Sequence, residues 1–437
     1  MKKVLILGAG LVAKPMVEYL LENRFRIMIA SPMKERADEM IDGNPEGKSL
    51  FWTMEDEVML DRLVTEYDLT VSLLPYKFHA GVAKVCLRNK KPLVTTSYVQ
   101  PEMQAMEKDV KNAGVIFLNE IGLDPGIDHM SAMKIIDHIH NGGGTVDEFY
   151  SICGALPAPE AADNPLRYKF SWSPKGVVMA SRNSALYLKN GKRVFIEPVN
   201  LFKDIFEVDF PGVGKLEVYP NRDSISYKDI YGIPKAQTIY RGTFRFKGWC
   251  ETLDLMKSIK MLDDDERDYS GMTFAGFLAE RAGLKTSDIR EGLCKKTGLL
   301  KTSTGIIALE WLGFFSDKDM GYKVTTPFEI TSDIMISKMA LTDHERDMVV
   351  LQHLFHASYP GGRKETIKSS MLDFGTPATN TSIARTVALP AAIAVKLILE
   401  GKISLAGVFR PVIPQIYEPV LKGLEEMNIR MKEEYLT

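Results

Sequence analysis

The chain has little cysteine, with four residues in 437: Cys86, Cys153, Cys250 and Cys294. These positions lie far apart, so no Cys-x-x-Cys pair or Cys/His spacing forms a compact zinc site or a disulfide framework. The pattern predicts no metal site and favours a reducing compartment. We therefore expect a cytoplasmic protein.

The sequence also lacks a surplus of charge and a long apolar run. Lys and Arg number 55 against 57 for Asp and Glu, a formal net charge of -2, whereas nucleic acid or an anionic membrane attracts a positive surplus. No stretch approaches the roughly 18 apolar residues that span a bilayer. The N-terminal run at residues 4–7 is too short for a signal peptide. We expect small-molecule ligands, with neither nucleic acid nor membrane as a partner.

A regular alternation fills the first part of the chain. The composition, 45% hydrophobic and 26% charged, is typical of globular proteins, and the length suits two to four domains of roughly 100–200 residues. Short apolar runs predict strands at residues 3–7, 26–30, 50–53, 69–74, 92–97 and 115–119. Amphipathic stretches predict helices at residues 15–22, 59–67, 81–88 and 102–112. Apolar strands separated by helices predict a doubly wound parallel sheet, the Rossmann arrangement.

The pattern changes after residue 122. Strand-like and helical pieces predict an α+β domain over residues 129–262 and 338–380, with a hairpin around the Pro-Gly-Gly turn at 360–362. Short helical patterns predict a small all-helical insertion at 263–337. A last helix at 381–399 and the tail to residue 437 are expected to return to the Rossmann domain of residues 1–128.

A glycine loop follows the first predicted strand. Gly8, Gly10 and Ala13 match the pattern GxGxxA, in which the glycines permit a tight turn and a close approach of pyrophosphate to the backbone. Leu11 and Val12 complete the loop, whose N–H groups open a helix that favours anions. The position of this motif predicts dinucleotide binding.

The second strand lacks the usual acidic residue that binds an adenosine ribose 2′-hydroxyl. It is followed instead by Ser31, Lys34 and Arg36. A hydroxyl and positive charges suit a 2′-phosphate, which favours NADP over NAD. The alternative is that these charges only face solvent.

Polar motifs follow the later strands, and ligands of doubly wound sheets bind at the carboxyl ends of strands. These motifs are LLPYKFH at 73–79, TTSY at 95–98 and NEIGLDPGIDH at 119–129. Farther along stand CGALPAPE at 153–160, NPLRYKFSWS at 164–173, YPNRDS at 219–224 and RGTFR at 241–245.

Together these motifs resemble the saccharopine dehydrogenases of the glutamate-forming type, including the dehydrogenase portion of aminoadipic semialdehyde synthases. The resemblance covers essentially the whole chain. It implies a Rossmann domain, an α+β domain that supplies the substrate site and dimer contacts, and a small helical domain. It also implies a homodimer that reduces the imine of glutamate and 2-aminoadipate 6-semialdehyde to saccharopine, and catalyses the reverse, with NADP favoured over NAD.

The resemblance implies contacts for both ligands. Substrate contacts fall on Ser97, Tyr98, Asp124, Arg222, Thr243, Phe244 and Arg245. Nucleotide contacts fall on Gly8, Gly10, Leu11, Val12, Ala13, Ser31, Lys34, Leu74, Pro75, Thr96, Ser97, Leu123, Asp124, Gly126, Ile127 and Cys153. Fungal members carry a Cys-Arg pair where this chain has Ser31-Pro32, so the resemblance does not identify the group that binds the 2′-phosphate.

Two residues are candidates for proton transfer. Asp124 suits a cationic nitrogen, and His79 has a side chain that titrates near neutrality; the alternative for His79 is a helix cap or a phosphate contact. Saccharopine carries three carboxylates, which Arg222 and Arg245 suit because guanidinium binds carboxylate through paired hydrogen bonds. The alternative for either arginine is a structural ion pair.

Two other functions remain open. One is a related NADP-dependent, imine-reducing dehydrogenase such as carboxynorspermidine dehydrogenase. The other is a non-catalytic NADP-sensing protein. The direction of the reaction, lysine synthesis or lysine breakdown, is left open because one site catalyses both.

Overall fold

The computed structural model describes residues 1–436, apart from the side chain of Thr286. The chain divides into two compact units, residues 1–146 with 357–437 and residues 147–356, which we call unit 1 and unit 2. The predicted division into three domains stays a prediction.

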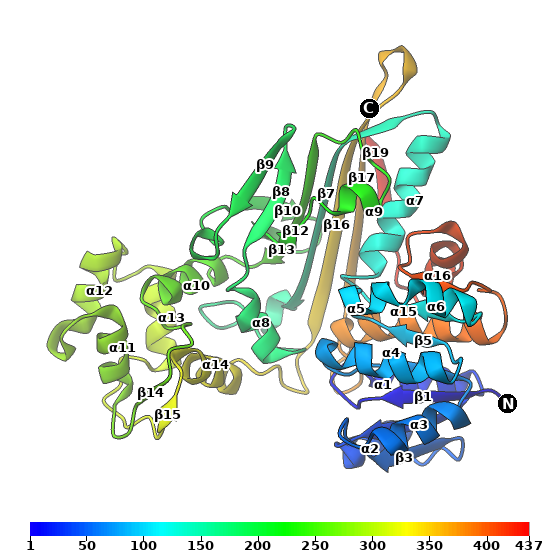
Figure 1. Ribbon diagram of the computed structural model, residues 1–437. Coiled ribbons are helices and arrows are strands. Elements are labelled where there is room, and N and C mark those ends of the chain that lie inside the picture. The colour runs from blue at the N-terminus through cyan, green and yellow to red at the C-terminus, as the bar shows by residue number, and fades with distance from the viewer. Residues whose placement is uncertain (437) are drawn as a thin grey trace. The chain divides into compact units, whose positions relative to one another are not determined.

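Unit 1 contains a seven-stranded sheet in the order β18-β6-β5-β4-β1-β2-β3, and every pair in it is parallel. The order from β3 to β6 is the Rossmann order 3-2-1-4-5-6, so the predicted doubly wound sheet is confirmed (Figure 1). The strands are β1 (Lys3–Leu7), β2 (Arg26–Ser31), β3 (Gly47–Phe51), β4 (Leu69–Ser72), β5 (Leu93–Thr95), β6 (Ile116–Leu118) and β18 (Gly407–Phe409).

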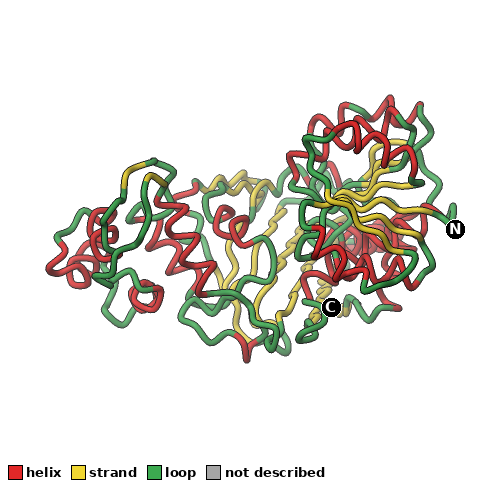
Figure 2. The backbone as a smooth tube through the Cα atoms, turned by 90° about the horizontal axis from the view of Figure 1, so that it is seen from below, coloured by secondary structure: helices red, strands yellow, loops and turns green. Residues whose placement is uncertain are grey.

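Helices cover both faces of this sheet (Figure 2), which explains why residues 4–7 of the central strand β1 are all apolar and fully buried. The helices between the strands are α1 (Lys14–Glu22), α2 (Lys34–Ile41), α3 (Glu57–Glu66), α4 (His79–Arg88), α5 (Pro101–Ala105) and α6 (Glu107–Asn112), with a 3-10 turn, η1, at Tyr76–Phe78. The helix predicted at 102–112 is thus two short helices.

Three further helices complete unit 1: α7 (Ile127–Asn141), α15 (Ser382–Leu399) and α16 (Pro414–Glu426). The expectation that no apolar stretch approaches the length of a membrane span was wrong, because α15 has 18 residues with a mean hydropathy of 1.7. However, 72% of α15 is buried inside the structure, and it packs on α1. These contacts identify α15 as a core helix.

The predicted hairpin turn lies between β16 (Asp347–Ser358) and β17 (Lys364–Phe374). The N–H of Tyr359 donates to the carbonyl of Arg363, 2.9 Å away, which closes the turn. In unit 1, β17 then pairs antiparallel with β19 (Lys432–Leu436).

Unit 2 contains a mixed sheet in which β10, β11, β13, β7 and β16 are neighbours in that order. Strand β13 runs parallel to β7 and antiparallel to β11, as expected for an α+β domain. The strands not yet bounded are β7 (Thr145–Pro157), β8 (Ala185–Lys189), β9 (Lys192–Ile196), β10 (Phe206–Phe210), β11 (Gly214–Pro220), β12 (Arg222–Asp223) and β13 (Thr238–Arg245).

The remaining elements of unit 2 are mostly helical. They are η2 (Pro159–Ala161), α8 (Pro174–Ala180), η3 (Pro198–Asn200), α9 (Tyr227–Ile230), α10 (Trp249–Ser258), α11 (Phe274–Ala282), η4 (Thr286–Asp288), α12 (Ile289–Thr297), α13 (Thr304–Leu312) and α14 (Pro327–Lys338). One short pair of strands, β14 (Arg267–Asp268) and β15 (Val324–Thr325), lies among the helices of residues 263–337.

Candidate functional site

The glycine loop begins where β1 ends, beside the end of β4. Gly8 has a φ of +105°, and its N–H donates to the carbonyl of Ala30 at 2.9 Å. A Cβ at Gly8 would lie 3.2 Å from the carbonyl oxygen of Leu73 and 3.6 Å from the side chain of Leu74. Glycine therefore fits between β1 and β4, the point where strand order reverses and where ligands of such sheets bind.

The rest of this loop presents unused donors. In the described part of the chain, the N–H groups of Leu11 and Val12 have no hydrogen-bond acceptor, and Ala13 is buried at the start of α1. A Cβ at Gly10 would meet no atom within 4 Å, so space remains above the loop. Free N–H groups at a helix N-terminus beside open space fit a pyrophosphate.

The residues expected at the 2′-phosphate are only partly available. Ser31 ends β2 and is buried, with its hydroxyl accepting from the N–H of Met33 at 3.1 Å. Lys34 forms an ion pair with Asp38 at 2.6 Å. Arg36, in the first turn of α2, is half-buried and makes no ion pair within residues 1–436. Arg36 is thus the more available cation of the two.

His79 is buried in a group of hydroxyls, with 2% of its surface exposed. Its Nδ1 lies 2.9 Å from the hydroxyl oxygen of Ser72, and its Nε2 lies 2.8 Å from that of Ser97 and 3.3 Å from that of Thr95. Burial lowers the pKa of His79 to about 4. A neutral ring with both nitrogens engaged suits a residue that positions Ser97 better than a general base.

Tyr98 and Asp124 form the polar pair of unit 1. The Tyr98 hydroxyl donates to Asp124 Oδ1 at 3.2 Å, and both side chains are half-buried. The pair joins the turn after β5 to the loop after β6. Thr96, in the first of these turns, contacts Gly122 in the second: a Cβ at Gly122 would lie 3.1 Å from the Thr96 Cβ.

Leu74 is half-buried and Pro75 exposed at the end of β4.

The loop that carries Asp124 turns tightly into α7. The N–H of Ile127 donates to the Gly122 carbonyl at 2.8 Å, and a Cβ at Gly126 would lie 2.0 Å from that same oxygen. The N–H of Asp128 donates to the carbonyl of Leu123, and Leu123 is buried. Only glycine at position 126 allows this turn.

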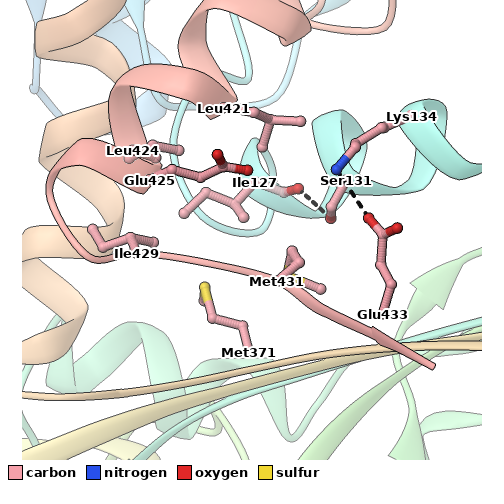
Figure 3. Close-up of a pocket in the computed structure, with 10 residues that line it drawn as sticks. All are labelled: Ile127, Ser131, Lys134, Met371, Leu421, Leu424, Glu425, Ile429, Met431 and Glu433. Atoms are coloured by element: carbon pink, nitrogen blue, oxygen red, sulfur yellow. Dashed lines mark hydrogen bonds and ion pairs between the residues drawn. The ribbon is translucent and has the colours of Figure 1, made fainter.

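Ile127 faces the interior of unit 1, where its side chain lines a small cavity (Figure 3). The cavity holds about 10 Å³, room for one water molecule, so it is not a ligand site. A larger depression of about 660 Å³ in unit 2 is lined by charged side chains, including Arg182, Lys257 and Asp264. None of the residues predicted to bind ligands lines that depression.

In unit 2 the predicted residues gather on neighbouring strands. Thr243 on β13 is the register partner of Cys153 on β7 and of Tyr219 on β11. Cys153 and Phe244 are buried. Arg222 lies on β12 with an exposed side chain and a φ of +50°.

Arg245 is a buried cation that makes no ion pair with an acidic side chain in the described part of the chain, and 5% of its surface is exposed. Its guanidinium donates to the carbonyl of Phe244 at 2.9 Å, whereas its Nε has no partner. The guanidinium carbon lies 5.0 Å from the Tyr168 ring, 5.3 Å from the Trp249 ring and 5.8 Å from the Tyr219 ring. Such cation–π contacts hold a guanidinium without using all of its donors.

A further buried donor near Arg245 lacks a partner among the described residues. It is the indole nitrogen of Trp249, whose ring packs on the guanidinium, whereas the Tyr168 hydroxyl and the Trp172 indole interact with each other. Unpartnered donors in a protein interior indicate a missing acceptor, and a carboxylate would supply one. Sequence reasoning gave these residues no role, although Tyr168 and Trp172 belong to the quoted motif NPLRYKFSWS.

Strand order and loop geometry define a dinucleotide-binding Rossmann protein with a second, α+β unit. Two family models match the chain: "Saccharopine dehydrogenase NADP binding domain" over residues 4–118 and "Saccharopine dehydrogenase C-terminal domain" over residues 122–429. The chain belongs to the saccharopine dehydrogenase family.

Individual relatives agree with this family. The chain is 37% identical over 453 residues to saccharopine dehydrogenase [NADP(+), L-glutamate-forming] of Schizosaccharomyces pombe, covering 100% of this chain and 99% of the relative. It is 37% identical to bovine mitochondrial alpha-aminoadipic semialdehyde synthase over 98% of this chain and 47% of that protein. The apo saccharopine dehydrogenase (L-Glu forming) structure from Saccharomyces cerevisiae superposes with a TM-score of 0.93 at 36% identity, covering all of both chains.

The open space at Gly10 generates a test of the cofactor loop. We expect Gly10→Ala to leave the free energy of unfolding unchanged or slightly higher, because alanine restricts the unfolded chain. The dissociation constant for NADP⁺ should rise on the order of tenfold or more, because the methyl group occupies the space for pyrophosphate. Denaturant unfolding and fluorescence titration measure the two quantities. Gly81→Ala, at an exposed position in α4, is the control that should change neither binding nor fold.

The depressed pKa of His79 predicts a pH-dependent stability. Between about pH 6.5 and about pH 4 the unfolded chain binds a proton that the folded chain does not, so the free energy of unfolding falls as the pH drops through this window. The loss is on the order of 3 kcal/mol at about 1.4 kcal/mol per pKa unit. Urea unfolding at several pH values should show a shallower dependence for His79→Gln. The exposed-site control His140→Gln should keep the wild-type slope, and equal slopes for all three proteins would contradict the burial argument.

The isolated charge of Arg245 predicts that stability and binding respond differently to its loss. We expect Arg245→Met to leave the free energy of unfolding unchanged or raised, because a buried cation without an acidic partner is costly. The KM for substrate should nevertheless rise on the order of tenfold or more. Arg281 is the control: it is similarly buried but paired with the more exposed Asp263 and Asp265, so Arg281→Met should destabilise the fold by about 1.5 kcal/mol or more through lost charged hydrogen bonds. Equal destabilisation by both variants would remove Arg245 from the ligand site.

Proposed function

We propose that this chain is an NADP-dependent, L-glutamate-forming saccharopine dehydrogenase of lysine metabolism. The observation that carries the proposal is the pair of buried donors on Arg245 and Trp249 that lack a partner among the described residues of unit 2, in a chain with the complete Rossmann loop in unit 1. Similarity along the full length of glutamate-forming relatives supports the same activity. The physiological direction, synthesis or breakdown of lysine, is left open.

The cofactor would be held by the loop of residues 8–13 and by the ends of β2, β4 and β5. The N–H groups of Leu11 and Val12 would bind pyrophosphate, and Ser31 and Arg36 would meet the 2′-phosphate. When bound, NADP accepts a hydride in saccharopine oxidation and supplies one in the reverse direction. Cys153 would lie near the nicotinamide.

The substrate's three carboxylates require positive groups, which Arg222 and Arg245 supply. Each charged hydrogen bond contributes about 1.5–3 kcal/mol. Oxidation removes a hydride from carbon and a proton from nitrogen to give an imine, and water then splits the imine into glutamate and 2-aminoadipate 6-semialdehyde. The Asp124 carboxylate, oriented by Tyr98, would stabilise the cationic nitrogen and take part in the proton transfer.

Location and assembly belong to the same proposal. The wide spacing of the four cysteines supports a reducing compartment such as the cytoplasm. The family resemblance supports a homodimer. Sedimentation equilibrium would measure the oligomeric state, and cell fractionation the location.

The decisive assay supplies saccharopine and NADP⁺ and identifies the products by mass spectrometry. We expect glutamate and 2-aminoadipate 6-semialdehyde, with NADP⁺ preferred to NAD⁺. Lysine and 2-oxoglutarate as products would contradict the glutamate-forming assignment. Turnover of carboxynorspermidine but not saccharopine would support the related dehydrogenase, and tight NADPH binding without any turnover would support a sensor.

A further inference from the structure

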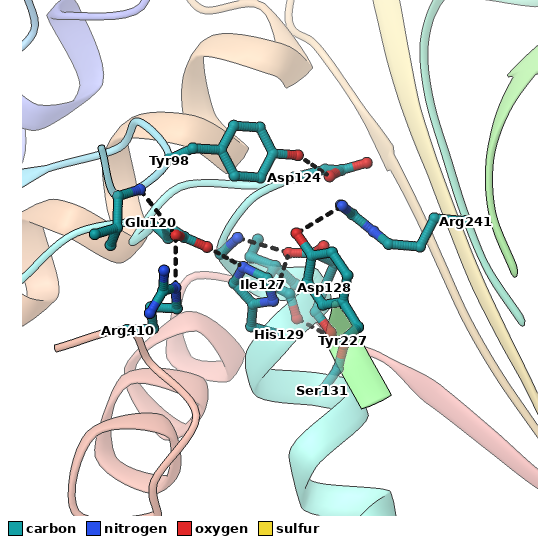
Figure 4. A network of polar contacts seen from close by, with 12 residues as sticks. Tyr98, Glu120, Asp124, Ile127, Asp128, His129, Ser131, Tyr227, Arg241 and Arg410 are labelled. Atoms are coloured by element: carbon teal, nitrogen blue, oxygen red, sulfur yellow. Dashed lines mark hydrogen bonds and ion pairs between the residues drawn. The ribbon is translucent and has the colours of Figure 1, made fainter. Parts of the chain in front are cut away.

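Glu120 is a buried acid that the proposed chemistry does not use. It lies just after β6, is 2% exposed, and has a φ of +57°, a backbone conformation that residues other than Gly, Asn and Asp rarely adopt. A charged residue kept in a strained, buried position indicates a role for its side chain. Figure 4 shows its carboxylate at the centre of a network.

The first part of this network encloses Tyr98. The N–H of Glu120 donates to the carbonyl of Ser97 at 3.1 Å, on one side of Tyr98. The N–H of Val99, on the other side, donates to Glu120 Oε1 at 2.9 Å. One residue therefore fixes the backbone both before and after the tyrosine.

The second part closes the loop that carries Asp124. Glu120 begins this loop and His129 follows it in the first turn of α7, and His129 Nε2 lies 2.8 Å from Glu120 Oε2. Loop residues 121–128 are thereby bridged by a side-chain contact between two groups that are both buried. The same acid thus anchors both partners of the Tyr98–Asp124 pair.

A third contact comes from a distant segment. Arg410, just after β18, donates through Nε to Glu120 Oε1 at 2.8 Å. Burial alone would raise the pKa of Glu120, but the contacts from His129, Arg410 and the Val99 N–H bring it below its usual value. Glu120 is therefore ionised at neutral pH, and its charge is compensated within unit 1.

We propose that Glu120 is a positioning residue that sets the geometry of Tyr98 and Asp124, with His129 and Arg410 holding its carboxylate. The inference rests on the proposed function for the roles of Tyr98 and Asp124. Glu120 does not touch the reacting atoms; it acts through the two loops. A merely structural role would affect the fold as a whole and would not be specific to these loops.

The first test does not depend on activity. Hydrogen exchange measured by mass spectrometry on the full chain compares wild type, Glu120→Gln and Glu120→Asn. Glutamine has one accepting side-chain oxygen, so it cannot replace both Oε1, which accepts from Val99 and Arg410, and Oε2, which contacts His129. Asparagine tolerates a positive φ but is shorter. Amides of residues 97–99, 121–124 and 126 should exchange on the order of tenfold faster in both variants, whereas β1 should be unaffected.

The control for this test is Lys134→Gln. Lys134 lies on α7, the helix that carries His129, and forms an ion pair with Glu433 on β19. Loss of this ion pair should leave both segments at wild-type exchange rates. Wild-type exchange in either segment of both Glu120 variants would overturn the inference. General acceleration throughout unit 1 would do so as well, because it would show a global structural role.

The second test is a double-mutant cycle on the KM for saccharopine. Tyr98→Phe should raise this KM by about fivefold in the wild-type background and by less than about twofold in the Glu120→Gln background, because residues that act through one arrangement are not additive. Equal effects in both backgrounds would overturn the inference. If the wild-type chain does not turn over saccharopine, the proposed function fails, whereas the exchange experiment still decides whether Glu120 holds the two loops.

Discussion

The organisation of unit 1 depends on one constraint: parallel strands end at the same edge of their sheet. Residues that follow β1, β4, β5 and β6 must therefore share that edge, however far apart they are in sequence. The Leu73 carbonyl leaves too little room for a Cβ at Gly8, which marks the reversal of strand order at this edge. The contact between His79 and Ser97 and the pair of Tyr98 with Asp124 follow from the same geometry.

Two buried charges in this protein have different surroundings: the contacts of Glu120 hold the loops of unit 1, whereas Arg245 keeps a donor for a ligand. Glu120 has every oxygen engaged, so its burial is compensated and it rigidifies the loops around it. Arg245 is almost as deeply buried, yet its Nε has no hydrogen-bond partner among the described residues. A folded chain keeps such a group only where aromatic rings offset part of the cost and where a ligand completes the hydrogen bonds.

Local patterns were sufficient to predict the central sheet and its glycine loop. Strand β1 has the predicted bounds, because an apolar run between polar residues marks a strand buried on both faces. The third strand was misplaced by about three residues at its start. It is the edge strand of the sheet, and its half-buried and exposed residues give no continuous apolar signal. The loop of residues 8–13 was predicted because its function depends on backbone spacing, which is a local property.

Features that depend on distant contacts were not predictable in the same way. Strand β13 carries Thr243, Phe244 and Arg245, yet its alternation is masked because nearly all of its residues are buried. His79 begins α4, and its ring contacts hydroxyls of Ser72 at the end of β4 and of Thr95 and Ser97 at the end of β5. These contacts are not visible in its sequence neighbourhood, so the usual pKa of histidine suggested acid–base chemistry where the structure favours positioning.

Arg410 illustrates the general limit, since it reaches Glu120 across 290 residues of sequence. Arg410 follows directly after β18, a strand of three residues that is too short to show a periodic pattern in the sequence. Groups that bind a ligand often lie in loops with a recognisable local pattern. The groups that hold those loops in place can come from any part of the chain that packs beside them. A segment late in the chain thus completes the support of the Tyr98–Asp124 pair, both of whose residues lie within the first 130 residues. The Rossmann sheet of this chain is for the same reason not a separable N-terminal piece: its seventh strand and the cation beside Glu120 both belong to the C-terminal segment.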